Sequence, residues 1–191
     1  MTDSQDQIHI NKVLGGNAHA FSYLLEKYKD YVFTIAVNIV KNREEAEDVA
    51  QESFVKAYSQ LKTFKGNSKF STWLYTITFR TAISATRKNN LAMSDIDTYI
   101  IDNYGDDGLV NQIEMLAKKD REFYIKKALA ALPELDALVL TLYYLNENTT
   151  EEIEEITGLN KNNIKVRMHR ARKKLAESIE RILPNEMASF N

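Results

Sequence analysis

Residues 149–175 read TTEEIEEITGLNKNNIKVRMHRARKKL. Thr149 and Glu152 are spaced as a capping box, in which each side chain accepts a hydrogen bond from the other residue's backbone N–H. Gly158 can adopt the left-handed conformation that ends a short helix, and Asn160 can cap the helix that follows. This order of cap, glycine turn and second cap predicts a helix-turn-helix.

The second of these helices is apolar on one side and basic on the other. Its predicted buried stripe consists of Ile164, Met168, Ala171 and Leu175. Residues 161–174 contain seven Lys or Arg and no acid. Lys and Arg neutralise phosphates and match guanine edges, and Asn matches adenine, so this face predicts binding to duplex DNA. The candidate contacts are Lys161, Asn162, Lys165, Arg167, His169, Arg170 and Arg172. A helical hairpin with a solvated basic face is the alternative.

Helical spacing also dominates the rest of the chain, where strand signals are nearly absent. We expect a long amphipathic helix after Gly15-Gly16, with Asn17 as its N-cap. Two further helices are expected at about 44–61 and 71–88, and another begins at Pro133. The predicted class is therefore all-α, with two small helical domains.

The loop before the third helix, and that helix itself, combine aromatic rings with cations. Residues 53–94 contain seven Lys or Arg and no acid. Rings stack on unpaired bases while cations follow the backbone, so this composition is typical of a single-strand binder. The candidate contacts are Lys65, Asn67, Lys69, Thr72, Trp73, Thr76 and Arg80. A core position would explain an aromatic residue such as Trp73 equally well.

A polar stripe lies on the predicted helix 44–61. Its members, three to four residues apart, are Asp48, Gln51, Glu52 and Val55. Such a stripe, acidic with one aliphatic side chain, fits a surface that docks a partner protein, and it fits plain solvent-exposed surface as well.

Composition excludes several other classes of protein. The 191 residues include no cysteine and carry a net charge of −2, so disulfides and thiolate metal sites are excluded. No apolar run reaches the length of a membrane span, and no secretory signal is visible, so we expect a cytoplasmic protein without membrane insertion. The three histidines are scattered and no phosphate-binding glycine motif is present, so we expect no enzyme, metal or cofactor. Residues 91–120 contain seven acidic and two basic residues, and within this acidic region residues 89–118 are expected to form a linker.

Three stretches together resemble an extracytoplasmic-function (ECF) sigma factor of the sigma-70 family. They are REEAEDVAQESFVKAYSQL (43–61), TFKGNSKFSTWLYTI (63–77) and LPELDALVLTLYYL (132–145), the last continuing to residue 175. The resemblance implies that region two spans residues 8–88, a linker 89–118, and region four 119–182.

The resemblance also implies a role for each surface. Asp48, Gln51 and Glu52, with Val55 on the same stripe, would grip core RNA polymerase. The loop 65–69, which includes Ser68, would capture a base flipped from the −10 element. Thr72, Trp73, Thr76 and Arg80 would help to open the duplex. The helix from Lys161 would read the −35 element of promoter DNA. An anti-sigma factor is a further candidate partner, because the family often has a membrane-bound one.

The sequence departs from the family pattern at the DNA contacts. Arg80 stands where the family often has Asn, and Ser84 where it often has Asp. Asn160 and the three residues after it replace the usual Pro-Val-Gly-Thr opening of the recognition helix. The promoter preferences of relatives are therefore not carried over to this chain. A stand-alone helix-turn-helix regulator is the alternative function, and it would leave the basic aromatic segment without a role.

Overall fold

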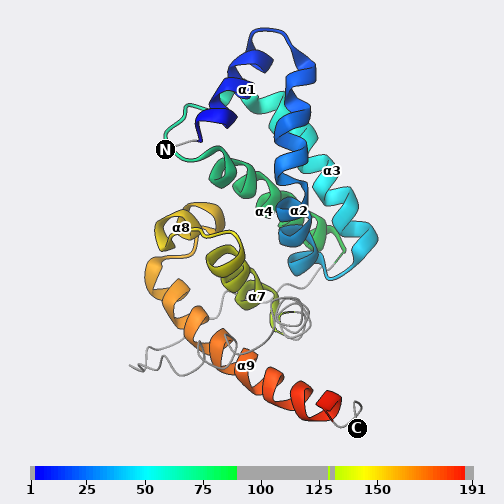
Figure 1. Ribbon diagram of the computed structural model, residues 1–191, viewed down its shortest axis with the longest axis vertical. Helices are drawn as coiled ribbons and strands as arrows, with labels where there is room; N and C mark the ends of the chain where they lie inside the picture. The colour runs from blue at the N-terminus through cyan, green and yellow to red at the C-terminus, as the bar shows by residue number, and fades with distance from the viewer. Residues whose placement is uncertain (1–2, 90–128, 130–131, 188–191) are drawn as a thin grey trace.

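The computed structural model describes residues 3–89, 129 and 132–187, and every regular element among them is a helix. The N-terminal helices are α1 (Ser4–Leu14), α2 (Phe21–Val40), α3 (Arg43–Gln60) and α4 (Phe70–Asn89), with short 3₁₀ turns at Ala18–Ala20 and Leu61–Thr63. The C-terminal elements are α7 (Glu134–Leu140), a π-helical turn (Thr141–Leu145), α8 (Thr150–Thr157) and α9 (Lys161–Met187). The all-α prediction is confirmed (Figure 1).

Capping residues and charges near the helix ends determine where several of these helices begin. The side chain of Asn42 caps α3 by accepting a hydrogen bond from the Glu45 backbone N–H at 3.1 Å. Glu44 and Glu45 then lie in the first turn, where the helix dipole favours acids. The predicted cap at Asn17 is wrong: its side chain makes no capping bond, and a 3₁₀ turn separates it from α2. Asn17 instead precedes the 3₁₀ turn Ala18–Ala20, and α2 begins at Phe21.

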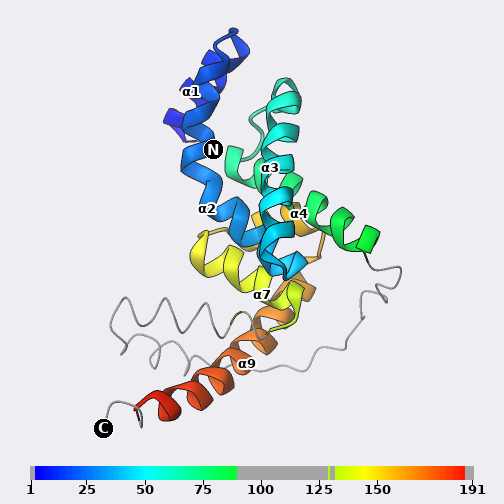
Figure 2. The ribbon, with the colours of Figure 1, turned by 90° about the vertical axis from the view of Figure 1, so that its right-hand side faces the viewer.

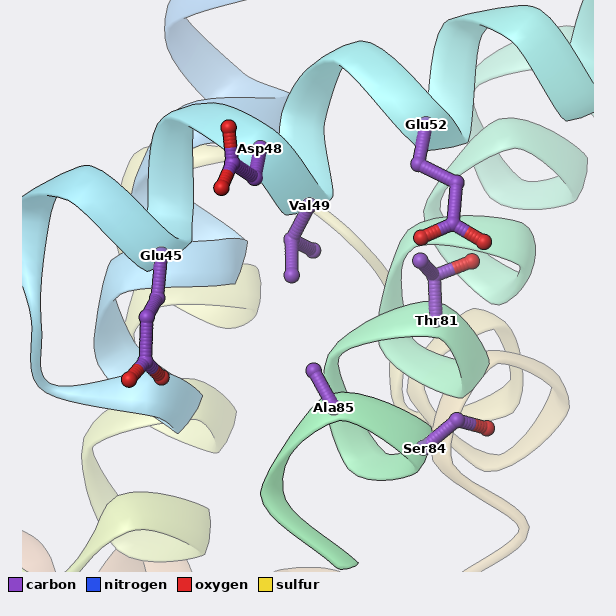
Figure 3. A pocket seen from close by; sticks show the side chains of 7 residues that line it. All are labelled: Glu45, Asp48, Val49, Glu52, Thr81, Ser84 and Ala85. Atoms are coloured by element: carbon purple, nitrogen blue, oxygen red, sulfur yellow. The ribbon is translucent and has the colours of Figure 1, made fainter. Parts of the chain in front are cut away.

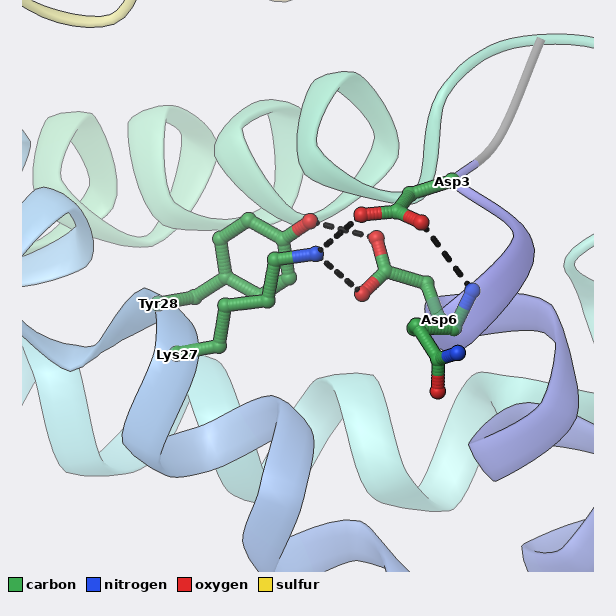
Figure 4. Close-up of polar contacts among 5 residues, drawn as sticks. Asp3, Asp6, Lys27 and Tyr28 are labelled. Carbon is green, nitrogen blue, oxygen red and sulfur yellow. Dashed lines mark hydrogen bonds and ion pairs between the residues drawn. The ribbon is translucent and has the colours of Figure 1, made fainter.

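Helix α1 has no counterpart in the sequence analysis, and a buried carboxylate attaches it to α2 (Figure 4). The side chain of Asp6 is only 2% exposed. It accepts hydrogen bonds from the Tyr28 hydroxyl at 2.5 Å and from Lys27 Nζ at 2.7 Å. Lys27 also reaches Asp3, the N-cap of α1, at 2.8 Å. Burial and the hydrogen bond to Asp6 raise the pKa of the Tyr28 hydroxyl, so Tyr28 stays a donor at physiological pH.

Replacing Asp6 with alanine is expected to lower the free energy of unfolding by about 2–3 kcal/mol, because hydrogen bonds to a buried charge are lost and the Tyr28 hydroxyl is left unpaired. Chemical denaturation followed by circular dichroism measures the change. The control is Glu26→Ala on α2, whose exposed side chain pairs with Lys29 of the same helix and should contribute less than about 0.5 kcal/mol. Equal effects of the two substitutions would contradict an anchoring role for Asp6.

One apolar core runs through both halves of the described chain. It includes Leu24 and Ile35 of α2 and Phe70 of α4, and it continues without a break into Leu138 of α7 and Ile153 of α8. Figures 1 and 2 show α7 and α8 packed beneath α2 and α4, with α9 extending away from them. The predicted domains are therefore in contact. The predicted linker lies outside the described residues apart from its first residue, as does the start of the predicted second domain, residues 119–128.

Polar contacts accompany this apolar packing. Lys69 Nζ lies 2.9 Å from Glu152 Oε1, which joins the loop before α4 to α8. The Asn38 amide on α2 donates to the Thr141 hydroxyl at 2.9 Å, a buried hydrogen bond between residues 103 positions apart. These two contacts and the shared core hold the helix-turn-helix against the N-terminal helices.

Candidate nucleic-acid interface

The helix-turn-helix forms as its local signals predict. In the capping box, the Glu152 N–H donates to Thr149 Oγ1 at 3.2 Å and the Thr149 N–H donates to Glu152 Oε2 at 2.9 Å. Gly158 has φ +74°, which a residue with a side chain rarely adopts. The Asn163 N–H donates to Asn160 Oδ1 at 2.8 Å, so Asn160 caps α9. The predicted stripe Ile164, Met168, Ala171 and Leu175 is buried.

The opposite face of α9 presents most of the predicted basic residues. Lys161, Asn162 and Lys165 are exposed, and His169, Arg170 and Arg172 are partly exposed. A hydrogen bond from Lys161 to Glu151 at 2.9 Å raises the pKa of Lys161, which therefore stays cationic. The Arg172 guanidinium lies over the rings of Tyr143 and Tyr144, 5.9 and 5.5 Å from their centroids. These cations therefore share the side of α9 that lies opposite its buried stripe.

Arg167 does not belong to this exposed set. Its Nη1 donates to Asp136 Oδ1 of α7 at 2.9 Å, and the two side chains are 14% and 3% exposed. A carboxylate buried in this way needs a charged partner, so Arg167 holds α9 against α7. The predicted role of Arg167 in DNA binding stays a prediction. The structure pairs this side chain with a buried acid 31 residues earlier in the chain, a contact that helical spacing does not reveal.

The loop before α4 leads into a cluster of three aromatic rings. Lys65 and Asn67 are exposed, while Ser68 and Lys69 are partly buried. The Trp73 ring is partly buried, with its centroid 5.4 Å from that of Phe64 and 5.7 Å from that of Phe70. Phe70 itself is fully buried. The Trp73 ring therefore combines packing with a surface that remains open to solvent.

The predicted polar face of α4 is only partly exposed. Arg80 is exposed and Thr76 is partly buried, with its hydroxyl donating to the Thr72 carbonyl oxygen at 2.9 Å. Thr72 is fully buried, and its hydroxyl oxygen has no hydrogen-bond partner among the residues that the structure describes. Thr72 is therefore not accessible to DNA in this arrangement, because α4 turns this position towards the interior.

The acidic stripe on α3 is wholly exposed. Asp48, Gln51 and Glu52 are exposed, and Val55 is 68% exposed, the highest value among the large apolar side chains described. We call these four residues the docking face. Glu52 forms an ion pair with Lys56, one turn further along the helix, at 2.7 Å.

A cavity of about 370 Å³ lies between α3 and α4 beside the docking face (Figure 3). Glu45, Asp48 and Glu52 line it from α3, and Thr81 and Ser84 line it from α4. The sequence analysis missed Glu45 and Thr81 as members of this surface. Glu45 precedes Asp48 by three residues, a helical spacing that signals a shared face, whereas the position of Thr81 depends on how α4 packs on α3.

Two classes of site are not found among the described residues. No group of three or more His, Cys, Asp or Glu side chains there could hold a metal ion. No described helix is both long and apolar enough to cross a membrane.

The fold and these surfaces define an all-helical protein that carries a helix-turn-helix and, on a separate group of helices, a basic and aromatic loop. Two family models match the chain: Sigma-70 region 2 over residues 24–91 and Sigma-70, region 4 over residues 122–175. The chain is 30% identical to the RNA polymerase sigma-H factor of Pseudomonas aeruginosa, over 96% of this chain and 98% of the relative. It is also 30% identical to the ECF RNA polymerase sigma factor SigW of Bacillus subtilis, over 89% and 94% of the two chains.

Solved structures share the fold. CnrH in complex with the cytosolic domain of CnrY superposes with a TM-score of 0.63 at 20% identity, covering 94% of this chain and 99% of CnrH. RpoE of Bartonella quintana in complex with the anti-sigma factor NepR gives a TM-score of 0.62 at 23% identity, covering 84% and 96%.

The chain belongs to the ECF group of the sigma-70 family. It is an RNA polymerase sigma factor, which directs promoter recognition, DNA melting and transcription initiation. The stand-alone regulator is not favoured, because regions 2 and 4 are both present and the relatives match over nearly their whole length.

Proposed function

We propose that three surfaces of this chain divide the work of initiation. The docking face on α3 binds core RNA polymerase, and the segment from Lys65 to Arg80 binds the unpaired −10 strand. The −35 duplex is bound by the candidate side chains of α9 that are exposed or partly exposed: Lys161, Asn162, Lys165, His169, Arg170 and Arg172. On this proposal residues 8–88 form the first functional domain, 89–118 the linker and 119–182 the second. The proposal rests on the observation that one chain exposes a basic helix-turn-helix, a basic loop beside partly exposed aromatic rings, and an acidic helix face.

An energy comparison supports the need for polymerase. Opening about four base-pair steps costs on the order of 6 kcal/mol, at about 1.4 kcal/mol per step. Capturing two bases by stacking returns roughly 2–6 kcal/mol, at about 1–3 kcal/mol per base. The balance is near zero or unfavourable, so the chain alone does not melt a promoter, and polymerase supplies the remaining contacts.

Run-off transcription from genomic DNA with added core polymerase tests this function. Discrete transcripts that depend on the added protein are the expected result. In a gel shift, the protein should bind promoter duplex tightly only when core polymerase is present. Tight binding to a duplex operator by the protein alone, without any association with polymerase, would overturn the proposal.

The contribution of the recognition helix is testable at Lys165, an exposed residue of the α9 basic face. Lys165→Ala is expected to weaken binding by about 1–3 kcal/mol at one position of the −35 element if the side chain contacts a base. Lysine acts as a point charge without the bidentate geometry of arginine, which favours the lower end of this range. Competition binding with singly substituted −35 sequences measures it, and exposed Lys173→Ala is the control. A uniform loss across all sequences would assign Lys165 to a phosphate instead.

Partners and location follow from the family. The relative RpoE was solved with an anti-sigma factor, and we propose that this chain is likewise held by one when inactive. It acts in the cytoplasm, where bacterial polymerase is, and as an initiation factor with no catalytic reaction of its own. On this proposal, the acidic residues in the first turns of α3 and α8 stabilise these helices by interacting with the helix dipoles.

A further inference from the structure

Two exposed tyrosine rings lie beside Arg172 of α9, and none of the three proposed surfaces includes them. Tyr143 and Tyr144 are 37% and 46% exposed. The Arg172 Cζ atom lies 5.9 and 5.5 Å from the centroids of their rings, distances at which a guanidinium is attracted to an aromatic ring. The two rings meet edge to face, with centroids 5.0 Å apart and an interplanar angle of 81°. Rings of two different orientations therefore restrict the guanidinium in two directions.

The backbone that carries these rings is the π-helical turn Thr141–Leu145. The Asn146 N–H closes this turn by donating to the Thr141 carbonyl oxygen at 3.1 Å, five residues back. Thr141 and Leu142 are fully buried, so they fix the turn in the interior while the next two side chains are exposed. Short π-helical segments of this kind occur frequently at functional sites. The two rings are thus presented from a well-held backbone.

The position of Arg172 is fixed from the side of α9. Its neighbour Ala171 shares a buried cluster with Leu140, the last residue of α7, and the π-helical turn follows Leu140 directly. The Nε atom of Arg172 is buried and has no hydrogen-bond partner among the residues that the structure describes. The residue as a whole is partly exposed. The rings therefore contact the guanidinium from the protein side, and the side chain keeps an exposed part that an anion can approach.

The place of Arg172 along α9 indicates which part of the DNA it meets. Arg172 lies 11 residues after Lys161, where α9 begins, which is about 16 Å along the helix axis at about 1.5 Å per residue. A recognition helix contacts base edges with its N-terminal residues, and the major groove is only about 12 Å wide. Arg172 therefore lies beyond the base edges, at the level of the phosphates that border the groove.

We propose that Tyr143 and Tyr144 are positioning residues that hold the Arg172 guanidinium for one phosphate of the −35 duplex. An arginine side chain loses conformational freedom when it binds, and this loss lowers affinity. Rings that restrict the guanidinium before DNA arrives reduce that loss. The inference rests on the proposed binding of the −35 duplex by α9, and it adds two residues that lie outside that helix.

A double-mutant cycle tests whether the tyrosines act through Arg172. Tyr143→Leu with Tyr144→Leu removes both rings and keeps apolar side chains at these exposed positions. The holoenzyme, formed from the full chain and core polymerase, is titrated against a fluorescent promoter fragment found by run-off transcription, and anisotropy gives the affinity. The double change should weaken binding about threefold to tenfold. In a chain that already carries Arg172→Ala, the same double change should alter affinity less than about twofold.

Tyr143→Phe with Tyr144→Phe is the matched control. It keeps both rings and removes only their hydroxyl groups. Because a phenylalanine ring also attracts a guanidinium, the affinity of this variant should stay within about twofold of the wild-type value.

The salt dependence of binding identifies the phosphate. Arg172→Ala should reduce the slope of log affinity against log salt concentration by about one, because each phosphate contact releases about one counterion. The leucine changes should leave this slope nearly unchanged, since the contact still forms in the complex and only its conformational cost has risen. Their effect should also be equal on promoters with substituted −35 bases, because a phosphate carries no sequence information.

The other outcomes each contradict a stated part of the inference. An equal loss with and without Arg172→Ala would mean that the tyrosines act on the fold or contact DNA themselves, and would overturn the positioning role. A loss with phenylalanine as large as with leucine would assign the effect to the hydroxyl groups and overturn it as well. An unchanged salt slope for Arg172→Ala would remove the phosphate as its target. A wild-type holoenzyme without promoter affinity would instead remove the proposed function.

Discussion

Reversing two charges of the docking face, by Asp48→Arg with Glu52→Arg, is expected to lower sigma-dependent transcription at least about 100-fold. Like charges brought together across an interface cost several kcal/mol, and about 2.7 kcal/mol is already 100-fold in affinity. Both side chains are exposed, so the fold should survive. The Glu52–Lys56 pair that is lost lies within one helix and contributes about 0.5 kcal/mol or less. Affinity for core polymerase, measured by fluorescence anisotropy, should fall in parallel with run-off transcription.

Glu44→Arg with Glu47→Arg provides the control for this prediction. It makes the same change of charge on α3, at exposed positions outside the docking face. Its effect on polymerase affinity should stay within about threefold, since screening weakens exposed charges that do not meet a partner. If both pairs reduce affinity equally, the acidic charge of the whole helix matters and the docking face has no special role.

Trp73→Ala is expected to reduce open-complex formation by about 10- to 100-fold while leaving the affinity for core polymerase unchanged. Stacking of a base on an aromatic ring contributes about 1–3 kcal/mol, and each 1.4 kcal/mol is about tenfold. Because the net free energy of promoter melting is near zero, the loss of stacking energy should appear almost fully as a smaller fraction of open promoter. Permanganate reactivity of unpaired thymines measures that fraction directly.

Phe70→Ala tests the alternative that Trp73 serves only the core. Phe70 is fully buried against Tyr28 and Phe64, and its loss should lower stability by about 3–5 kcal/mol and remove every activity. Trp73→Ala should instead keep most of the thermal stability. If Trp73→Ala loses stability and polymerase binding together, as Phe70→Ala does, Trp73 is a core residue and the proposed stacking is wrong.

The helix-turn-helix could be predicted from the sequence because each of its signals is local. The capping box joins Thr149 to Glu152, and the cap of α9 joins Asn160 to Asn163. Gly158 adopts the positive φ that its turn requires because it has no side chain. Contacts of this kind depend on residues within one helical turn, so propensity and spacing determine them before any tertiary structure exists.

The remaining features depend on pairs that are distant in sequence. Helix α1 has a polar sequence, and it is held by Asp6 and Tyr28, which are 22 residues apart. The inward position of Arg167 depends on Asp136, 31 residues away. The contact between the two halves depends on Asn38 and Thr141, 103 residues apart. A periodic pattern shows which side of a helix is apolar, but it does not show which distant carboxylate an arginine will meet.

Because the apolar core is continuous, cutting the chain between its N-terminal and C-terminal halves would divide that core. Leu138, Val139 and Leu142 of the C-terminal half share one buried cluster with residues of α2 and α4. A fragment that ends near residue 88, or one that begins near 132, would expose the apolar side chains that the missing part of the chain covers in the intact protein. Each piece made alone should therefore be prone to self-association, and mixing the two pieces should restore solubility.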